Sequence, residues 1–169
     1  MIKFRMYMDK DAEQEWIMSM VEKGWAFQNF CAGFYQFEKC EPGEYIYQID
    51  LLDSFCKNED EFMEFMEEAH VEVVARWFKW VFLRKKASDG AFEMYTDTES
   101  KIDLYRRIKS MFTKVGILEI AIFIYELVGS FMTRSPLLIG AAIFIGLIVL
   151  VFLKMIWKCQ WKIEELKRQ

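Results

Sequence analysis

The stretch Pro136 to Trp157, PLLIGAAIFIGLIVLVFLKMIW, carries no charge before Lys154. About 20 apolar residues in a helix cross the hydrocarbon layer of a bilayer, which is roughly 30 Å thick. Ser135 is placed to cap such a helix, and a proline suits its first position. Tryptophan and lysine side chains at its far end are typical of a membrane boundary. The stretch therefore predicts a transmembrane helix.

A second apolar stretch, Val115 to Met132, comes directly before it and contains the carboxylates Glu119 and Glu126. A carboxylate near the bilayer centre costs about 2.5–3.5 kcal/mol, so the alternatives are a hairpin of two crossings or one crossing beside an interfacial helix. Basic residues precede the first stretch and follow the second, whereas Arg134 is the only base in the connection. The positive-inside rule then favours a hairpin in the cell membrane with both termini in the cytoplasm.

The part of the chain before the apolar stretches is acidic. Residues 1–114 hold 22 acids and 16 bases, a net charge of −6. A domain without a basic stripe is poorly suited to phosphates, which argues against nucleic acid as a partner. The chain is 54% apolar and 17% aromatic, which excludes intrinsic disorder. A reducing cytoplasm predicts four free thiols: Cys31, Cys40, Cys56 and Cys159.

The acidic part shows the order strand, helix, strand, strand twice. Hydrophobic alternation, helix caps and glycine stops place the first unit at residues 2–8, 9–24, 25–31 and 34–40. The second unit follows at residues 45–51, from near Asn58, near 71–75 and at 77–84. The expected fold is an antiparallel sheet with both helices on one face.

The two units also resemble each other residue by residue. A shift of 46 places Gly24 on His70 and Trp25 on Val71, and a further slip of one residue places Tyr35 on Trp80. Either the unit is duplicated, or any two amphipathic units of this order look alike. The order of elements is the same in both cases.

The fold class is therefore α+β, with a C-terminal transmembrane hairpin. The expected parts are a cytosolic domain at 1–95, a connector helix at 96–114, a transmembrane hairpin at 115–157 and a basic cytosolic tail at 158–169. Within the hairpin, the two helices are expected at 115–132 and 136–157.

The sheet is unusually rich in aromatic residues. Helices on one face leave the other face open, so rings there line a groove or a contact surface, while the remaining rings form the core. The sequence does not fix which register faces outward. The candidate ligand-binding or partner-binding residues are Trp25, Tyr35, Tyr47, Trp77 and Trp80.

The two carboxylates of the first apolar stretch are candidates for an intramembrane polar site. Glu119 and Glu126 are seven residues apart and share one helix face. One interpretation is that Glu119 reaches the membrane boundary while Glu126 pairs with Arg134 or with water. The other is that they contact a second helix or subunit, because intramembrane carboxylates normally face protein.

The chain shows none of the motifs that mark common active sites. It has no glycine-rich phosphate loop, and the patterns GxSxG, HExxH and CxxC are absent. We therefore expect no catalytic residue, no metal site and no cofactor, and an enzyme is not expected.

Five stretches carry a resemblance to a known family. Together they are similar to domain of unknown function 2812, a family of bacterial membrane proteins, over about residues 2–110: Trp16 to Trp25 (WIMSMVEKGW), Tyr35 to Lys39 (YQFEK), Pro42 to Leu51 (PGEYIYQIDL), Phe82 to Lys85 (FLRK) and Tyr95 to Ile102 (YTDTESKI). The resemblance implies a cytosolic domain followed by membrane helices, often encoded beside PadR-type repressors, and no established activity. The last stretch predicts a connector helix capped by Thr96 or Thr98.

The order of elements also resembles the paired modules of gyrase-inhibitor-like ligand-binding domains, which hold apolar cations in a cleft between repeats. This resemblance is one of fold, and a fold alone does not transfer a function.

Two functions from different classes follow as expectations. The first is a membrane-tethered cytosolic module that senses a ligand or a membrane state and engages a protein partner, with a PadR-type regulator or a membrane protein as the candidates. The second is a membrane-integral accessory or resistance protein whose helices associate with a transporter or oppose a toxic peptide. Both place the chain in the lipid bilayer, and both are compatible with a homo-oligomer.

Overall fold

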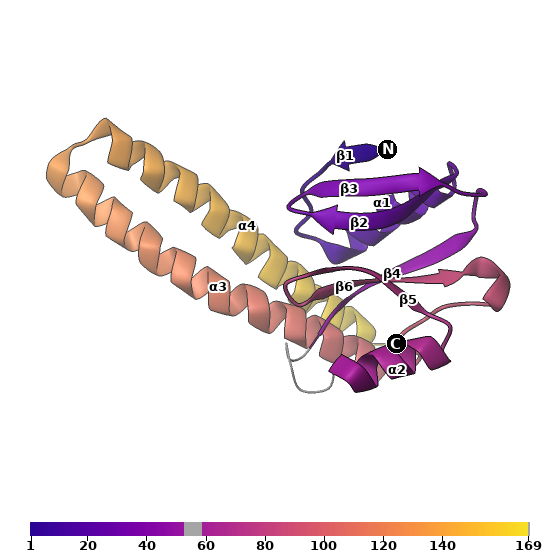
Figure 1. Ribbon diagram of the computed structural model, residues 1–169. Coiled ribbons are helices and arrows are strands. Elements are labelled where there is room, and N and C mark those ends of the chain that lie inside the picture. The colour runs from indigo at the N-terminus through magenta and orange to yellow at the C-terminus, as the bar shows by residue number, and fades with distance from the viewer. Residues whose placement is uncertain (53–58, 169) are drawn as a thin grey trace. The chain divides into compact units, whose positions relative to one another are not determined.

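The computed structural model describes residues 1–52 and 59–168 (Figure 1). The chain divides into two compact units, of which the first ends at Thr96 and the second begins at Asp97. Cys56 and Asn58, the expected start of the second helix, lie outside the described residues. Among the described residues, Cys31, Cys40 and Cys159 are not joined by disulfide bonds.

The N-terminal unit contains the predicted order of elements twice. The elements are β1 (Ile2–Phe4), α1 (Lys10–Val21), β2 (Trp25–Cys31), β3 (Phe34–Lys39), β4 (Tyr45–Leu51), α2 (Glu59–Glu68), β5 (Glu72–Trp77) and β6 (Trp80–Lys86), followed by a short 3₁₀ turn at Ala87–Asp89. Together with the helical hairpin described below, this order confirms the α+β fold.

Each repeat forms its own antiparallel sheet, so there are two three-stranded sheets where the sequence predicts one. The first has the order β1-β3-β2 and the second β4-β6-β5. β2 and β5 are neighbours at the junction, and each carries a β-bulge, at Gln28 and at Val74. A bulge bends its strand and interrupts pairing. The sheets therefore meet through side chains, such as Phe30 and Trp77, whose rings are 5.6 Å apart.

The backbone repeats at the offset of 46 residues that the sequence predicts. The two bulges are 46 residues apart. The same offset relates the positive φ angles of Gly24 and His70, and those of Ala32 and Phe78. The additional slip of one residue is wrong, because β3 starts at Phe34 and β6 at Trp80, which are again 46 residues apart. The β2–β3 and β5–β6 turns have the same length of two residues, which preserves the register.

Two hydrophobic cores hold the unit together, and they lie on opposite faces of the second sheet. The larger core packs α1 against both sheets through Ile17, Met20, Val21, Phe27, Tyr35, Phe37, Tyr47, Ile49, Ala75 and Phe82. The smaller core packs α2 on β5 and β6 through Met66, Val71, Val81 and Leu83.

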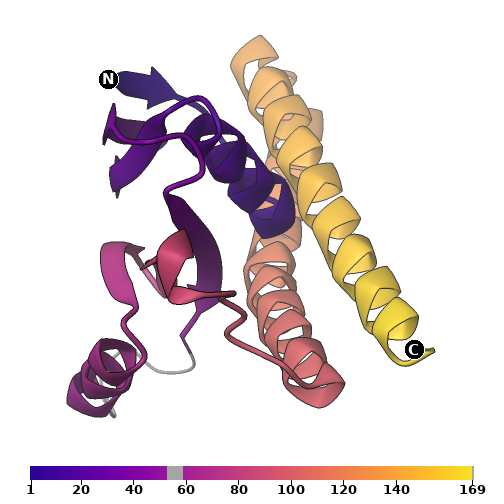
Figure 2. The same cartoon turned by 90° about the vertical axis from the view of Figure 1, so that its right-hand side faces the viewer.

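Along β6, Phe82 belongs to the larger core, whereas its neighbours Val81 and Leu83 belong to the smaller core. The helices α1 and α2 therefore lie on opposite faces of the second sheet (Figure 2), not on one face as predicted. Each helix covers the sheet of its own repeat. The face of the second sheet that α2 does not cover packs against the core of the first repeat. The second sheet is therefore buried on both faces.

A buried arginine links the two sheets. Arg84 on β6 donates to Glu72 on β5 at 2.6 and 3.0 Å, and its guanidinium lies 4.5 Å from the ring centre of Tyr45 on β4. Its Nη1 is 4.0 Å from Oε1 of Glu38, which belongs to β3 of the other sheet. The Arg84 side chain thus connects β6 with β5 and β4 of its own sheet and with β3 of the other sheet.

The second unit is a helical hairpin of α3 (Thr98–Thr133) and α4 (Pro136–Leu166), which lie side by side in both views (Figures 1 and 2). Their most apolar windows have mean hydropathies of 1.9 and 2.9, and both helices are long enough to cross a membrane. Asp97 caps α3 by accepting from the Ser100 amide at 2.7 Å, so the expected cap at Thr96 or Thr98 is wrong. A carboxylate at this position also complements the helix dipole.

The helices pack along a continuous antiparallel seam. Lys109 donates to Gln160 at 2.8 Å, and the rings of Phe112 and Phe152 are 5.7 Å apart. Farther along, the position of a Cβ on Gly146 would be 3.1 Å from the ring of Phe123. Small residues therefore let the apolar halves of the helices approach closely.

Two glycines provide a matched test of the first sheet. Gly33 and Gly43 both have positive φ, but a Cβ at Gly33 would lie 2.9 Å from Phe4 Cε2 and 3.0 Å from the Arg5 carbonyl oxygen. Nothing lies within 4 Å of the same position at Gly43. Because both variants strain φ but only one displaces β1, Gly33→Ala should destabilise the unit by about 1–2 kcal/mol more than Gly43→Ala. Thermal unfolding of the full chain in detergent measures this difference. Equal losses would contradict the packing of β1 against the β2–β3 turn.

Candidate functional site

Tyr35 and Tyr47, two of the five candidate aromatic residues, are core residues. Each side chain is 1% exposed. The Tyr35 hydroxyl donates to Oε1 of Glu13 at 2.5 Å, and the Tyr47 hydroxyl donates to the Phe27 carbonyl at 2.8 Å. Both tyrosines thus satisfy their polar ends inside the unit and present no surface to a partner.

The three tryptophans are half-buried and lie in different surroundings. Trp25 and Trp80 pack against the larger core. Trp77 makes edge contacts with Phe30 and Phe78, with ring centres 5.6 Å apart in both pairs. The structure therefore does not gather the five predicted residues on one open face.

A half-buried carboxyl group that is not among the residues predicted from the sequence, Glu13, lies on the side of α1 that faces the first sheet. Glu13 faces Tyr35, whose ring also contacts Trp16 and Phe30 with ring centres 4.8 Å apart in each pair. Burial raises the pKa of the Glu13 carboxyl from 4.5 to about 7, although the hydrogen bond from Tyr35 opposes this shift. The signal was available, because Glu13 precedes Trp16, Ile17 and Met20 by three, four and seven residues, the spacing of one helix face.

The open sheet face does exist, but other residues form it. Four apolar side chains on β1, β3 and the segment after β1 are strongly exposed: Ile2 (69%), Phe4 (59%), Met6 (81%) and Phe34 (53%). Phe4 and Phe34 are cross-strand partners with ring centres 5.0 Å apart. We call these four residues the open face of the first sheet.

Strand alternation explains why these residues are exposed. Tyr35 and Phe37 point toward α1, so Phe34 and its paired residue Phe4 point the other way. At the offset of 46 residues, Phe34 corresponds to Trp80, which is half-buried in the second sheet, and Gln36 corresponds to Phe82, which is buried there. The face that is buried in the second repeat is thus exposed in the first. Large exposed apolar surface of this kind is typical of an interaction site.

Glu119 and Glu126, the two carboxylates of the apolar stretch of α3, lie on the side of that helix that faces α4. Gly116 is next to Phe152, Phe123 to Gly146 and Gly129 to Leu138. Glu119 and Glu126 fall between these contacts and are half-buried, whereas adjacent residues of α3 are exposed. Among the described residues, neither carboxyl group has a hydrogen-bond or ion-pair partner.

Arg134 is the residue at which α3 ends, and its interactions do not involve Glu119 or Glu126. It adopts the left-handed conformation with φ of 52°, and its amide donates to the Ser130 carbonyl at 2.9 Å. Its side chain is exposed, and no ion pair with Glu126 occurs in the described part of the chain. Arg134 therefore ends the helix and forms no ion pair with Glu119 or Glu126 among the described residues.

The described residues contain no group of three histidine, cysteine or carboxylate side chains that could hold a metal ion. The described arrangement offers an apolar open face, a half-buried carboxyl group among aromatic rings, and two carboxylates in a helical seam.

Comparison with family models identifies a match that covers most of the chain. The family model described as "Protein of unknown function (DUF2812)" matches residues 9–117. No curated protein and no solved structure matches the chain.

The buried carboxyl group predicts a pH dependence of stability. Because the folded state raises the pKa of Glu13 to about 7, the folded state favours the neutral acid. Its contribution is fully present below pH 4.5 and is lost as the pH rises through 7, by up to about 3 kcal/mol. Glu13→Gln is neutral at every pH and should lack this loss. Urea unfolding of both full-length chains in detergent, monitored by tryptophan fluorescence between pH 5 and 8, tests this. Parallel pH profiles would contradict it.

Proposed function

The chain belongs to the DUF2812 family of proteins of unknown function, and from that premise we propose that it is a membrane-anchored regulatory module. In this proposal the N-terminal unit responds to a ligand or to the state of the membrane and engages a protein partner. The α3–α4 hairpin is the anchor, with both termini in the cytoplasm, as the basic flanks favour.

The open face of the first sheet is the observation that carries this proposal. The unit has two hydrophobic cores and still exposes Ile2, Phe4, Met6 and Phe34. Leaving such a patch in water is unfavourable by about 25 cal/mol for each Å² of apolar surface. A contact outside the unit offsets this cost, and that contact is the event to which the module responds.

The connection between the units supports a regulatory role. α3 begins at Thr98, directly after the N-terminal unit, and continues without interruption into the first apolar stretch. A continuous helix is stiff, so it is suited to transmit a change between the N-terminal unit and the membrane. The nature of the protein partner is a further proposal. A PadR-type regulator rests on the family resemblance alone, and self-association is the simplest alternative.

Photocrosslinking tests whether the open face makes an external contact. Benzoylphenylalanine at Phe34 replaces one exposed aromatic side chain by another, and Lys39 at the other end of β3 provides an exposed control position. In cells that produce the full chain, irradiation should give adducts at position 34 and several-fold fewer at position 39. Absence of any adduct at position 34, or equal yields at both positions, would refute the proposed binding surface.

A second candidate function is supported by the α3–α4 seam. Glu119 and Glu126 are half-buried in an apolar hairpin and have no polar partner among the described residues. A carboxylate in this setting normally pairs with another protein group. An accessory protein whose helices join a transporter, or oppose a toxic peptide, would obtain that group from its partner.

Neutralising one carboxylate distinguishes this second function. Glu126→Gln should change the oligomer size or the partner recovered in mild detergent, because a charged contact would be lost. Glu164→Gln removes an equal charge beyond the apolar stretch of α4 and should change neither. Size-exclusion chromatography with mass analysis of the eluted complex measures both quantities. An unchanged complex in Glu126→Gln would exclude this residue from partner binding.

A further inference from the structure

We infer that the open face of the first sheet binds the surface of the membrane that anchors the chain, with anionic phospholipid as its partner. The inference rests on the proposed function and deepens it by naming the molecule that the open face contacts. The N-terminal unit would then alternate between a membrane-bound and a released state.

The chemistry of the open face suits the membrane interface. Phenylalanine, methionine and isoleucine side chains partition into the boundary between headgroups and acyl chains. All four residues of the open face are of these types, and Phe4 and Phe34 form a pair of touching rings at its centre. Glu38, the acidic residue of β3, lies near the opposite end of that strand from Phe34. The apolar end of β3 is therefore the end that enters the interface.

The area of the open face is small for a stable protein interface. Four side chains of about 200 Å² each, exposed by 53–81%, provide less apolar surface than the roughly 800 Å² that each partner buries in a typical complex. A lipid interface has no such threshold, because the molecule is already anchored and needs only a weak additional contact.

Because α3 connects the N-terminal unit to the membrane anchor, lipid is the most abundant molecule near that unit. α3 starts at Thr98 and its apolar stretch starts at Val115. That part of a helix is about 25 Å long at 1.5 Å per residue. The N-terminal unit therefore cannot leave the vicinity of the bilayer, and its effective concentration at the membrane surface is high.

The charge distribution orients the unit with β1 toward anionic lipid. Residues 1–10 contain three bases and one acid, a net charge of +2, whereas residues 11–114 have a net charge of −8. Arg5 is exposed and lies between Phe4 and Met6 in the sequence, but strand alternation turns its side chain away from the open face, to 4.8 Å from the ring centre of Trp16. An anionic surface attracts the first segment and repels the remainder.

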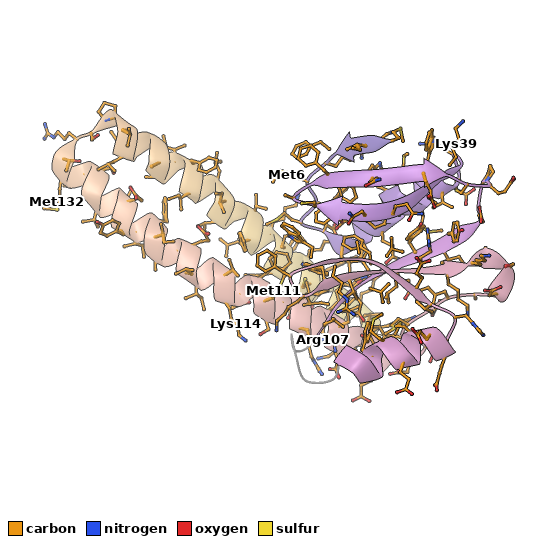
Figure 3. All side chains as sticks on the ribbon, in the orientation of Figure 1. Met6, Lys39, Arg107, Met111, Lys114 and Met132 are labelled. Carbon is orange, nitrogen blue, oxygen red and sulfur yellow. The ribbon has the colours of Figure 1, made fainter. Side chains whose placement is uncertain are left out.

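Lipid photocrosslinking in defined vesicles tests the inference with the full chain. Benzoylphenylalanine is placed at Phe34, at Met6 or at the control Lys39; the last two lie at opposite ends of the N-terminal unit (Figure 3). The protein is reconstituted into phosphatidylcholine vesicles with or without phosphatidylglycerol. After irradiation, intact mass analysis should show lipid adducts at positions 34 and 6, several-fold more than at position 39. The yield should fall several-fold without phosphatidylglycerol or at high salt.

The outcomes separate the inference from the proposed function. Adducts at position 34 that contain only protein, either a second copy or another chain, would overturn the lipid inference and leave the proposed binding surface intact. Equal lipid yields at positions 34 and 39 would also overturn the inference. Absence of every adduct at position 34 in cells would refute the proposed function itself. A Phe4→Ser variant, which keeps the larger core intact, should reduce the lipid adduct at position 6 while the melting temperature stays within a few degrees.

Discussion

Strand alternation in β3 is the constraint on which the N-terminal unit depends. Tyr35 and Phe37 point into the larger core under α1, and this fixes Phe34 and Gln36 on the other face. A shift of the strand register by one residue would bury Phe34 and expose Tyr35, whose hydroxyl donates a hydrogen bond to Glu13. The core, the buried carboxyl group and the open face are therefore three consequences of one register. The hydrogen bonds of β3 with β1 and β2 maintain it.

Much of this architecture could be predicted from the sequence, because local patterns determine it. The order of strands and helices, the offset of 46 residues and the apolar hairpin all follow from periodicity and turn residues. The division into two sheets could not be predicted, because the residue pattern does not show which strands pair, and the bulges at Gln28 and Val74 leave no distinct pattern either. The first sheet has an exposed apolar face, but its residues could not be predicted, because alternation gives two registers and only packing against α1 decides between them.

For the ionisable groups as well, the sequence pattern identifies some residues, while others depend on packing that the pattern does not reveal. Glu13 lies on the apolar face of α1 and could have been recognised from its spacing, whereas Arg84 joins two sheets whose arrangement the sequence does not reveal. Glu119 and Glu126 were identified from their positions in an apolar stretch, but the side of α3 that they occupy is visible only in the packing of α4. These groups differ in setting: Glu13 and Arg84 have partners inside the N-terminal unit, while Glu119 and Glu126 have none among the described residues.

The depth of β1 relative to the bilayer tests the membrane-facing role of the open face most directly. A nitroxide label at position 6, in a full chain whose native cysteines are replaced by serine, reports its exposure to oxygen and to a water-soluble nickel complex. In vesicles that contain phosphatidylglycerol, the label should be accessible to oxygen and protected from nickel, and the same label at position 39 should be accessible to nickel. A label at position 6 that is as accessible to nickel as the label at position 39 would show that the open face stays in water, contrary to what its composition and charge predict.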